Sequence, residues 1–140
     1  MAQLPSGLLE EIDGDEDLVR FLTQSSHFNT TSVKPAAFLP SPKSRETSVS
    51  RHGRKPVQNL WKIGTDAAGE RTLYGAAIFK AKDVRSSGLE VFADEPPPRH
   101  AAIRQWPWLE NDPELQKAQQ RERAILLSSA AGEPILVGSD

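Results

Sequence analysis

Apolar and polar side chains alternate through the middle of the chain, and this pattern limits what the chain can fold into. The clearest run extends from Thr72 to Ala81, where Leu73, Ala77 and Phe79 fall on one face. A period of two residues is typical of a β-strand that is buried on one side. Shorter segments with strand character occur at 36–39, 46–51, 57–63, 89–92 and 100–104. We therefore predict an antiparallel sheet built from residues 36–104.

Glycine inside the strongest strand carries a separate prediction. Gly75 interrupts the run from Thr72 to Ala81. Such a glycine indicates either a β-bulge or the close approach of another backbone.

Helices are predicted on both sides of this sheet. A short helix is expected over 15–24, with acidic residues in its first turn, where the helix dipole favours them. A longer helix is expected over 112–130, since Pro113 suits the first helical position and Gly132 follows the end. One helical turn is expected over 83–88.

The predicted fold class is α+β, with an antiparallel sheet, a short N-terminal helix and a longer C-terminal helix packed on the sheet. The chain has 140 residues, which favours a single domain over its whole length. Residues 1–14 are expected to be a loose lead-in. Residues 131–140 are expected to be either an edge strand or a mobile tail.

Composition excludes several function classes. The chain contains no cysteine and three histidines, so thiolate chemistry is excluded and a histidine-rich metal site is disfavoured. The sequence also lacks the common phosphate-loop, dinucleotide, zinc-protease and hydrolase motifs. No basic, apolar leader begins the chain and no long apolar run follows, which predicts a cytoplasmic protein away from membranes. We expect no metal and no cofactor.

Charge is segregated along the chain. Residues 1–20 carry six acidic residues and one basic, residues 34–85 carry eleven basic against four acidic, and residues 86–140 carry five basic against nine acidic. A basic middle between acidic ends attracts ligands that carry phosphate, or it neutralises the ends within one fold. The sequence leaves both interpretations open.

One polar stretch suggests a binding site. Residues 25–52 place hydroxyls, histidine, asparagine, lysine, glutamate and arginine around little aliphatic mass. If 36–39 and 46–51 pair as a hairpin, these side chains converge at one end of it. The candidate ligand-binding residues are Lys34, Ser48, Arg51 and Asn29, with His52 as an alternative to Arg51, because guanidinium and ammonium groups bind phosphate well.

Histidine is the candidate proton carrier. His27 and His100 are the candidate catalytic residues, since imidazole titrates near neutral pH, and Glu46 would orient one of them or act as the acid. The pair requires a fold that brings residues 27 and 100 together. The competing interpretation is that these are ordinary structural or solvated side chains.

Two hypotheses about function follow. The first is a domain that binds a phosphate-bearing ligand, either a nucleotide or a nucleic acid, with phosphodiester or glycosidic chemistry as an extension. The second is a non-catalytic adaptor or inhibitor that contacts another protein. The first predicts that Lys34→Ala and Arg51→Ala weaken binding and leave the melting temperature nearly unchanged.

Several short motifs also carry a resemblance. They are SSHFN, KPxAFLPS, ETSVxR, LYG and EPPPRHAxI, and they span Ser25 to Ile103. Together they resemble a group of small bacterial proteins of similar length. The resemblance implies a bacterial, cytoplasmic, single-domain protein from a mobile or accessory gene cassette. It brings no activity, ligand or catalytic residue, so the functional argument depends on the residues themselves.

Overall fold

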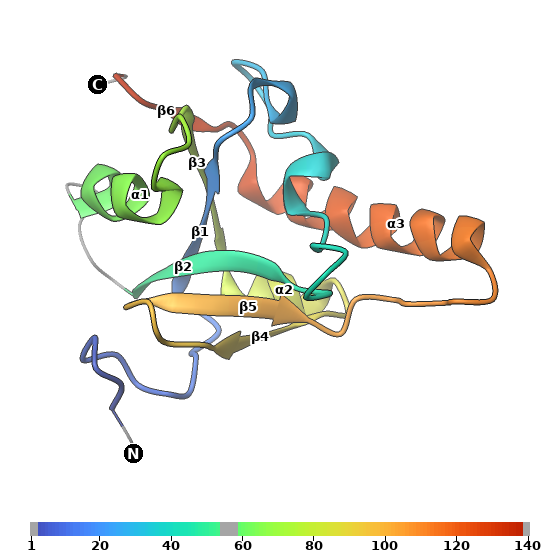
Figure 1. Cartoon of the computed structure of the whole chain (residues 1–140), viewed down its shortest axis with the longest axis horizontal. Coiled ribbons are helices and arrows are strands. Elements are labelled where there is room, and N and C mark those ends of the chain that lie inside the picture. Colours follow the sequence, from blue (N-terminus) through green and yellow to red (C-terminus); the bar gives the residue numbers. More distant parts are fainter. Residues whose placement is uncertain (1–2, 54–58, 139–140) are drawn as a thin grey trace.

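The computed structural model describes residues 3–53 and 59–138 and contains a six-stranded antiparallel sheet (Figure 1). The strand order is β4-β5-β2-β1-β3-β6. The strands are β1 (Asp17–Leu22), β2 (Thr47–Gly53), β3 (Gly75–Lys80), β4 (Glu90–Ala93), β5 (His100–Arg104) and β6 (Ile135–Leu136). The α-helices are α1 (Leu60–Ala68), α2 (Ala81–Ser86) and α3 (Pro113–Ala131), and the short 3-10 helices are η1 (Ser25–His27) and η2 (Pro35–Phe38). The predicted α+β single domain is confirmed.

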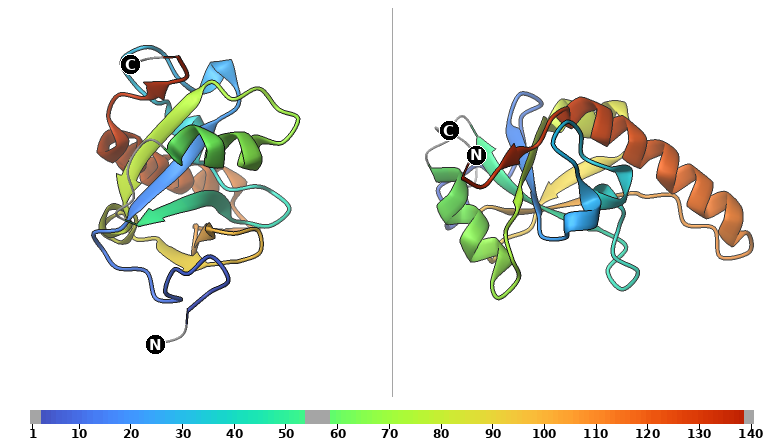
Figure 2. Two further views of the ribbon diagram at one scale, coloured as in Figure 1. Left: turned by 90° about the vertical axis from the view of Figure 1, so that its left-hand side faces the viewer. Right: turned by 90° about the horizontal axis from the view of Figure 1, so that it is seen from above.

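Helices lie on both sides of the sheet (Figure 2). On one side α3, α2 and η2 build the larger core, in which Phe38 and Leu127 pack with Leu18 and Leu22 of β1. On the other side α1 packs Leu60 against Val19 and Ala76. This second cluster covers β1 and β3, and Ser48 on the neighbouring strand β2 is left exposed. The sheet therefore has one fully covered face and one partly covered face.

Three predicted elements were wrong. Residues 15–24 contain strand β1 instead of a helix, because β1 buries Leu18 on one side and Val19 on the other. Such a strand reads as a continuous apolar run without alternation. Residues 36–39 lie in and beside the 3-10 helix η2, which begins at Pro35. The predicted hairpin with 46–51 therefore does not form.

The segment 57–63 was predicted as a strand and instead enters helix α1 at Leu60. Leu60, Gly64 and Ala68 are the buried residues of α1, and their spacing of four is the helical period. Residues 57–58 lie outside the described residues.

The other predicted elements are confirmed. Strands β2, β3, β4 and β5 and helices α2 and α3 occupy the predicted segments. A Cβ atom on Gly75 would lie 2.6 Å from the carbonyl oxygen of Ile135, so this glycine permits a close backbone approach. Of the two alternatives for the tail, the structure has an edge strand, in which Ile135 and Leu136 pair with β3.

The lead-in is tied to the body by several hydrogen bonds. Ser6 donates to Glu95 from its main-chain nitrogen and its hydroxyl, and the carbonyl oxygens of Leu9 and Ile12 accept from Arg51 and Arg85. Across residues 3–53 and 59–138, no helix has the length and apolar character needed to cross a membrane.

Candidate functional site

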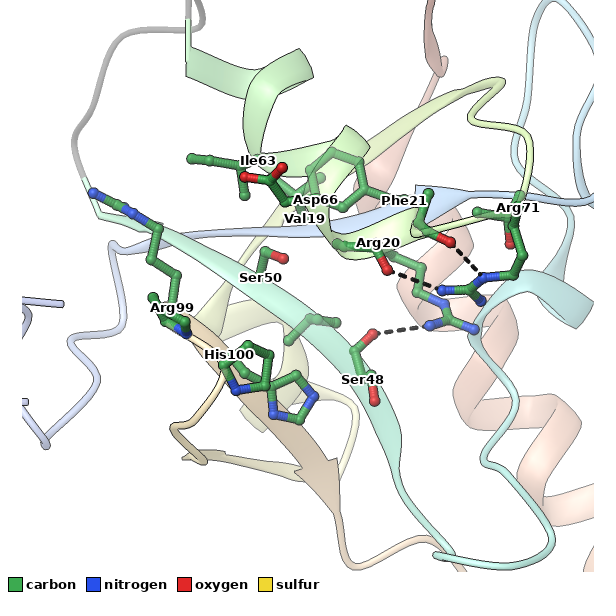
Figure 3. Close-up of a pocket in the computed structure, with 16 residues that line it drawn as sticks. Val19, Arg20, Phe21, Ser48, Ser50, Ile63, Asp66, Arg71, Arg99 and His100 are labelled. Carbon is green, nitrogen blue, oxygen red and sulfur yellow. Dashed lines mark hydrogen bonds between the residues drawn. The ribbon is translucent and has the colours of Figure 1, made fainter. Parts of the chain in front are cut away.

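A cleft of about 500 Å³ lies on the partly covered face of the sheet, between α1, strands β1 and β2, and the segment before β5 (Figure 3). Pockets of this size are typical of small-molecule sites. Apolar side chains form much of its wall, among them Val19, Phe21 and Ile63. Its polar lining consists of Arg20, Thr23, Ser48, Ser50, Asp66, Arg71, Arg99 and His100.

Arg20 and Arg71 lie together at one end of the cleft (Figure 3). Arg20 donates from Nε to the carbonyl oxygen of Ala37 at 2.8 Å and from Nη1 to that of Ser48 at 2.9 Å. Arg71 donates to the carbonyl oxygens of Ala67 and Ala68, both at 3.1 Å. Burial lowers the pKa of Arg20, and the positive charge of Arg71 lowers it further. The fold thus holds two like charges near each other.

Arg99 lies at the other end of the cleft (Figure 3). Its Nη1 atom donates to the carbonyl oxygen of Arg51 at 3.1 Å, and its main-chain nitrogen donates to Glu95 at 3.1 Å. Its φ of 69° lies in the left-handed region, which is costly for a residue with a Cβ atom. Several contacts therefore hold Arg99 in a strained conformation that places it in the cleft.

The cleft arginines differ in their partners from four arginines elsewhere in the fold. Arg45, Arg51, Arg85 and Arg104 each form an ion pair with a carboxylate. In the described part of the chain, Arg20, Arg71 and Arg99 form none and are held by carbonyl oxygens instead. Asp66 is the one carboxylate in the cleft lining, and it lies 3.8 Å from Lys62. The cleft therefore keeps a net positive charge.

Two of the residues predicted from the sequence line the cleft. Ser48 lies on β2 and His100 begins β5. The Nδ1 atom of His100 lies 2.9 Å from the carbonyl oxygen of Asp94 and 3.3 Å from its carboxylate. One ring nitrogen of His100 is therefore already engaged.

Arg51 is part of the core instead of the cleft. Its side chain is 1% exposed, and its Nε and Nη2 atoms lie 2.6 and 2.8 Å from the carboxylate of Glu16. Both sides of the guanidinium are occupied, so it is closed to a ligand. His52 is 5% exposed, and its Nε2 atom has no hydrogen-bond partner among the described residues.

The remaining predicted site residues lie away from the cleft lining. Glu46 pairs with Arg104 on β5. The side chain of Asn29 accepts hydrogen bonds from the main chain of Thr31 and Ser32 and so stabilises a turn. Lys34 is exposed. The predicted convergence at a hairpin end is wrong, because the hairpin itself is absent.

His27 lies in η1 and does not line the cleft, so His27 and His100 do not share it. Burial lowers the pKa of His27, and the charge of Arg20 lowers it further, which places His27 within electrostatic range of the Arg20 end.

Three residues of the candidate site were missed at the sequence level: Arg20, Arg71 and Arg99. One signal was present for Arg20, which interrupts the apolar run Leu18-Val19-Arg20-Phe21-Leu22. An arginine within a buried strand is unusual and calls for a partner or a role. Arg71 and Arg99 carried no such signal.

Comparison with protein-family models, with curated proteins and with solved structures finds no match to this chain. The resemblance to a group of small bacterial proteins therefore stays a prediction, and the functional argument depends on the cleft.

Proposed function

We propose that this protein binds a phosphate-bearing ligand in the cleft between α1, β1, β2 and the start of β5. The observation that carries the proposal is the set of cleft arginines, Arg20, Arg71 and Arg99, which have no carboxylate partner among the described residues. Uncompensated guanidinium groups that face one cavity form a site for an anion.

The way these arginines are held favours binding. Main-chain carbonyl oxygens fix the guanidinium groups before a ligand arrives, so little side-chain freedom is lost on binding. An anion between Arg20 and Arg71 also relieves the repulsion between their like charges. Phosphate suits this position because guanidinium binds phosphate oxygens in a two-pronged geometry.

The apolar walls favour an organic ligand over inorganic phosphate. Val19, Phe21 and Ile63 face the same cavity as the arginines. A cavity of about 500 Å³ lies within the range of small-ligand sites, roughly 300–1,000 Å³. A nucleotide has both parts, an anionic phosphate and a base whose flat aromatic faces pack against apolar side chains. The proposal is limited to binding. The predicted catalysis needed His27 and His100 in one place, and of these two residues His100 lines the cleft and His27 does not.

Titration calorimetry with adenosine 5′-monophosphate at low salt tests the proposal. We expect Arg71→Ala to weaken the affinity by about tenfold or more, since a lost charged hydrogen bond is worth about 1.5–3 kcal/mol. Arg45→Ala removes the same charge from the surface far from the cleft, where Arg45 pairs with Glu110, and should leave the affinity unchanged. No binding at low salt, or equal loss in both variants, would refute the proposal.

A second function, contact with another protein, is favoured by a different observation. Helix α3 carries exposed apolar side chains on its outer surface, with Leu115, Ile125 and Leu126 between 45% and 49% exposed. An adaptor would bind its partner through α3 and would be unaffected by Arg71→Ala. A partner that is lost on Leu126→Lys and retained in Arg71→Ala would favour this second function.

A further inference from the structure

The cations of the cleft form two separate groups. Figure 3 shows Arg20 and Arg71 at one end, near Ser48, and Arg99 at the other end, near Ser50 and His100. The two groups are anchored to different points of β2, since Arg20 donates to the carbonyl oxygen of Ser48 and Arg99 to that of Arg51. These two residues are three positions apart along a strand, which corresponds to about 10 Å.

The two groups are also fixed in place. Moving Arg20 toward the opposite end would break its hydrogen bonds to Ala37 and Ser48. Moving Arg99 would break its hydrogen bond to Arg51 and the main-chain contact with Glu95. One phosphate group therefore cannot satisfy both ends at once.

The space between the two groups has an apolar wall. Val19, Phe21 and Ile63 form this wall, and Asp66 lies beside them (Figure 3). A ligand that fills the cleft therefore has an anion at each end and an apolar or aromatic part between them. We infer that the ligand carries two phosphate groups on the ribose of one nucleoside, with the base against the apolar wall, which is the chemistry of a nucleoside 3′,5′-bisphosphate or of one step of a single-stranded nucleic acid.

This inference rests on the proposed function and narrows it. One phosphate lies between Arg20 and Arg71, and the other lies against Arg99. The hydroxyl groups of Ser48 and Ser50 add neutral hydrogen-bond donors along β2. A cavity of about 500 Å³ has room for a nucleoside and not for a duplex. Single strands are bound in this way, through backbone phosphates and the faces of unstacked bases.

The test compares adenosine 5′-monophosphate with adenosine 3′,5′-bisphosphate by titration calorimetry. On the unaltered protein, we expect the bisphosphate to bind about tenfold more tightly or better, since it reaches both ends. In Arg99→Gln this advantage should fall below about twofold, whatever the affinity of the variant for the monophosphate. Arg45→Ala serves as the control for loss of charge and should preserve the full advantage.

The outcomes separate this inference from the proposed function. If neither compound binds, the proposed function fails. If the monophosphate binds and the bisphosphate binds no more tightly, the inference of a second phosphate site fails and the proposed function stands. This comparison is made on the unaltered protein. An advantage that survives Arg99→Gln also refutes it, since the second phosphate would then contact another group.

A further arm distinguishes the two sources of this chemistry. A thymidine pentanucleotide that binds more tightly than thymidine 3′,5′-bisphosphate identifies a single-stranded nucleic acid as the ligand. A pentanucleotide that binds more weakly identifies the free nucleotide, because the cleft then excludes the neighbouring residues of a chain.

Discussion

Removing Arg51 tests whether this residue belongs to the core or to a ligand site. Arg51 and Glu16 are 1% and 8% exposed, and two nitrogen–oxygen contacts of 2.6 and 2.8 Å join them. The third guanidinium nitrogen donates to the carbonyl oxygen of Leu9 at 2.7 Å. Arg51→Ala therefore leaves a buried carboxylate without a partner and removes the hydrogen bond that joins β2 to Leu9 of the lead-in.

The size of the effect follows from this burial. Breaking one side of a buried ion pair costs about 3–5 kcal/mol. For a chain of this length, 1 kcal/mol lowers the melting temperature by roughly 3–4 °C. We therefore expect thermal denaturation followed by circular dichroism to place Arg51→Ala roughly 10–20 °C below the unaltered protein. This replaces the expectation, drawn from the sequence, that Arg51→Ala leaves the melting temperature nearly unchanged.

Two further variants make the test decisive. Lys34 is exposed, so Lys34→Ala should change stability by less than about 0.5 kcal/mol. The double variant Glu16→Leu/Arg51→Met removes both buried charges and should recover most of the loss, since apolar pairs often replace buried ion pairs well. The reasoning is refuted if Arg51→Ala has the same melting temperature as Lys34→Ala and also weakens phosphate binding, because Arg51 would then contact the ligand.

Three other predictions concern the stability effects of His52, Gly64 and Arg99. Burial, with the charge of Arg99, lowers the pKa of His52 from 6.5 to about 4, so the unfolded chain takes up a proton first and stability falls as the pH drops from 6.5 toward 4. Between pH 6.5 and 4, the unaltered protein should therefore lose up to about 3 kcal/mol more of its free energy of unfolding than His52→Phe loses. Equal losses in the two proteins would contradict this prediction. In α1, a Cβ atom on Gly64 would lie 2.6 Å from the ring of Phe21, so Gly64→Ala should lower the melting temperature, whereas helix propensity alone would stabilise the fold by about 1 kcal/mol. At Arg99, with its φ of 69°, Arg99→Gly should be about 1 kcal/mol more stable than Arg99→Ala in urea denaturation, and equal stabilities would exclude backbone strain.

The sequence predicted the elements that carry a local signal. Strand β2 alternates between buried and more exposed residues over Thr47–Arg51. Helix α3 is capped by Asp112, whose side chain accepts a hydrogen bond from the main chain of Leu115, and ends before Gly132. Local signals of this kind depend on neighbours in the sequence, so they can be read without the fold.

The errors occurred where both faces are buried or where two periods fit. Strand β1 packs Leu18 and Val19 into different cores, which removes the alternation. In α1, the apolar residues Leu60, Trp61 and Ile63 are compatible with either period at this short length. In the fold, burial of Leu60, Gly64 and Ala68 on one face, at a spacing of four residues, is what favours the helix.

The cleft was hidden for a different reason. Its arginines come from β1, from the segment after α1 and from the segment before β5, and they are far apart in the sequence. The binding site was predicted in the polar stretch 25–52 because its polar residues are contiguous in the sequence. Of this stretch, Ser48 and Ser50 line the cleft. The residues that give the cleft its charge are brought together by the order of the strands.

The ion pairs of the fold explain most of the charge segregation along the sequence. Cations of the basic middle pair with acids of both ends, through Arg51–Glu16, Lys80–Asp17, Lys82–Asp15, Arg45–Glu110 and Arg85–Glu90. Neutralisation within the fold therefore accounts for these side chains, which was one of the two interpretations open at the sequence level. The cleft arginines are a separate set, and two of them come from outside the basic middle, Arg20 from the acidic start and Arg99 from the acidic end. The cleft arginines are therefore recognised by the absence of a carboxylate partner in the described part of the fold, and not by the composition of the segments from which they come.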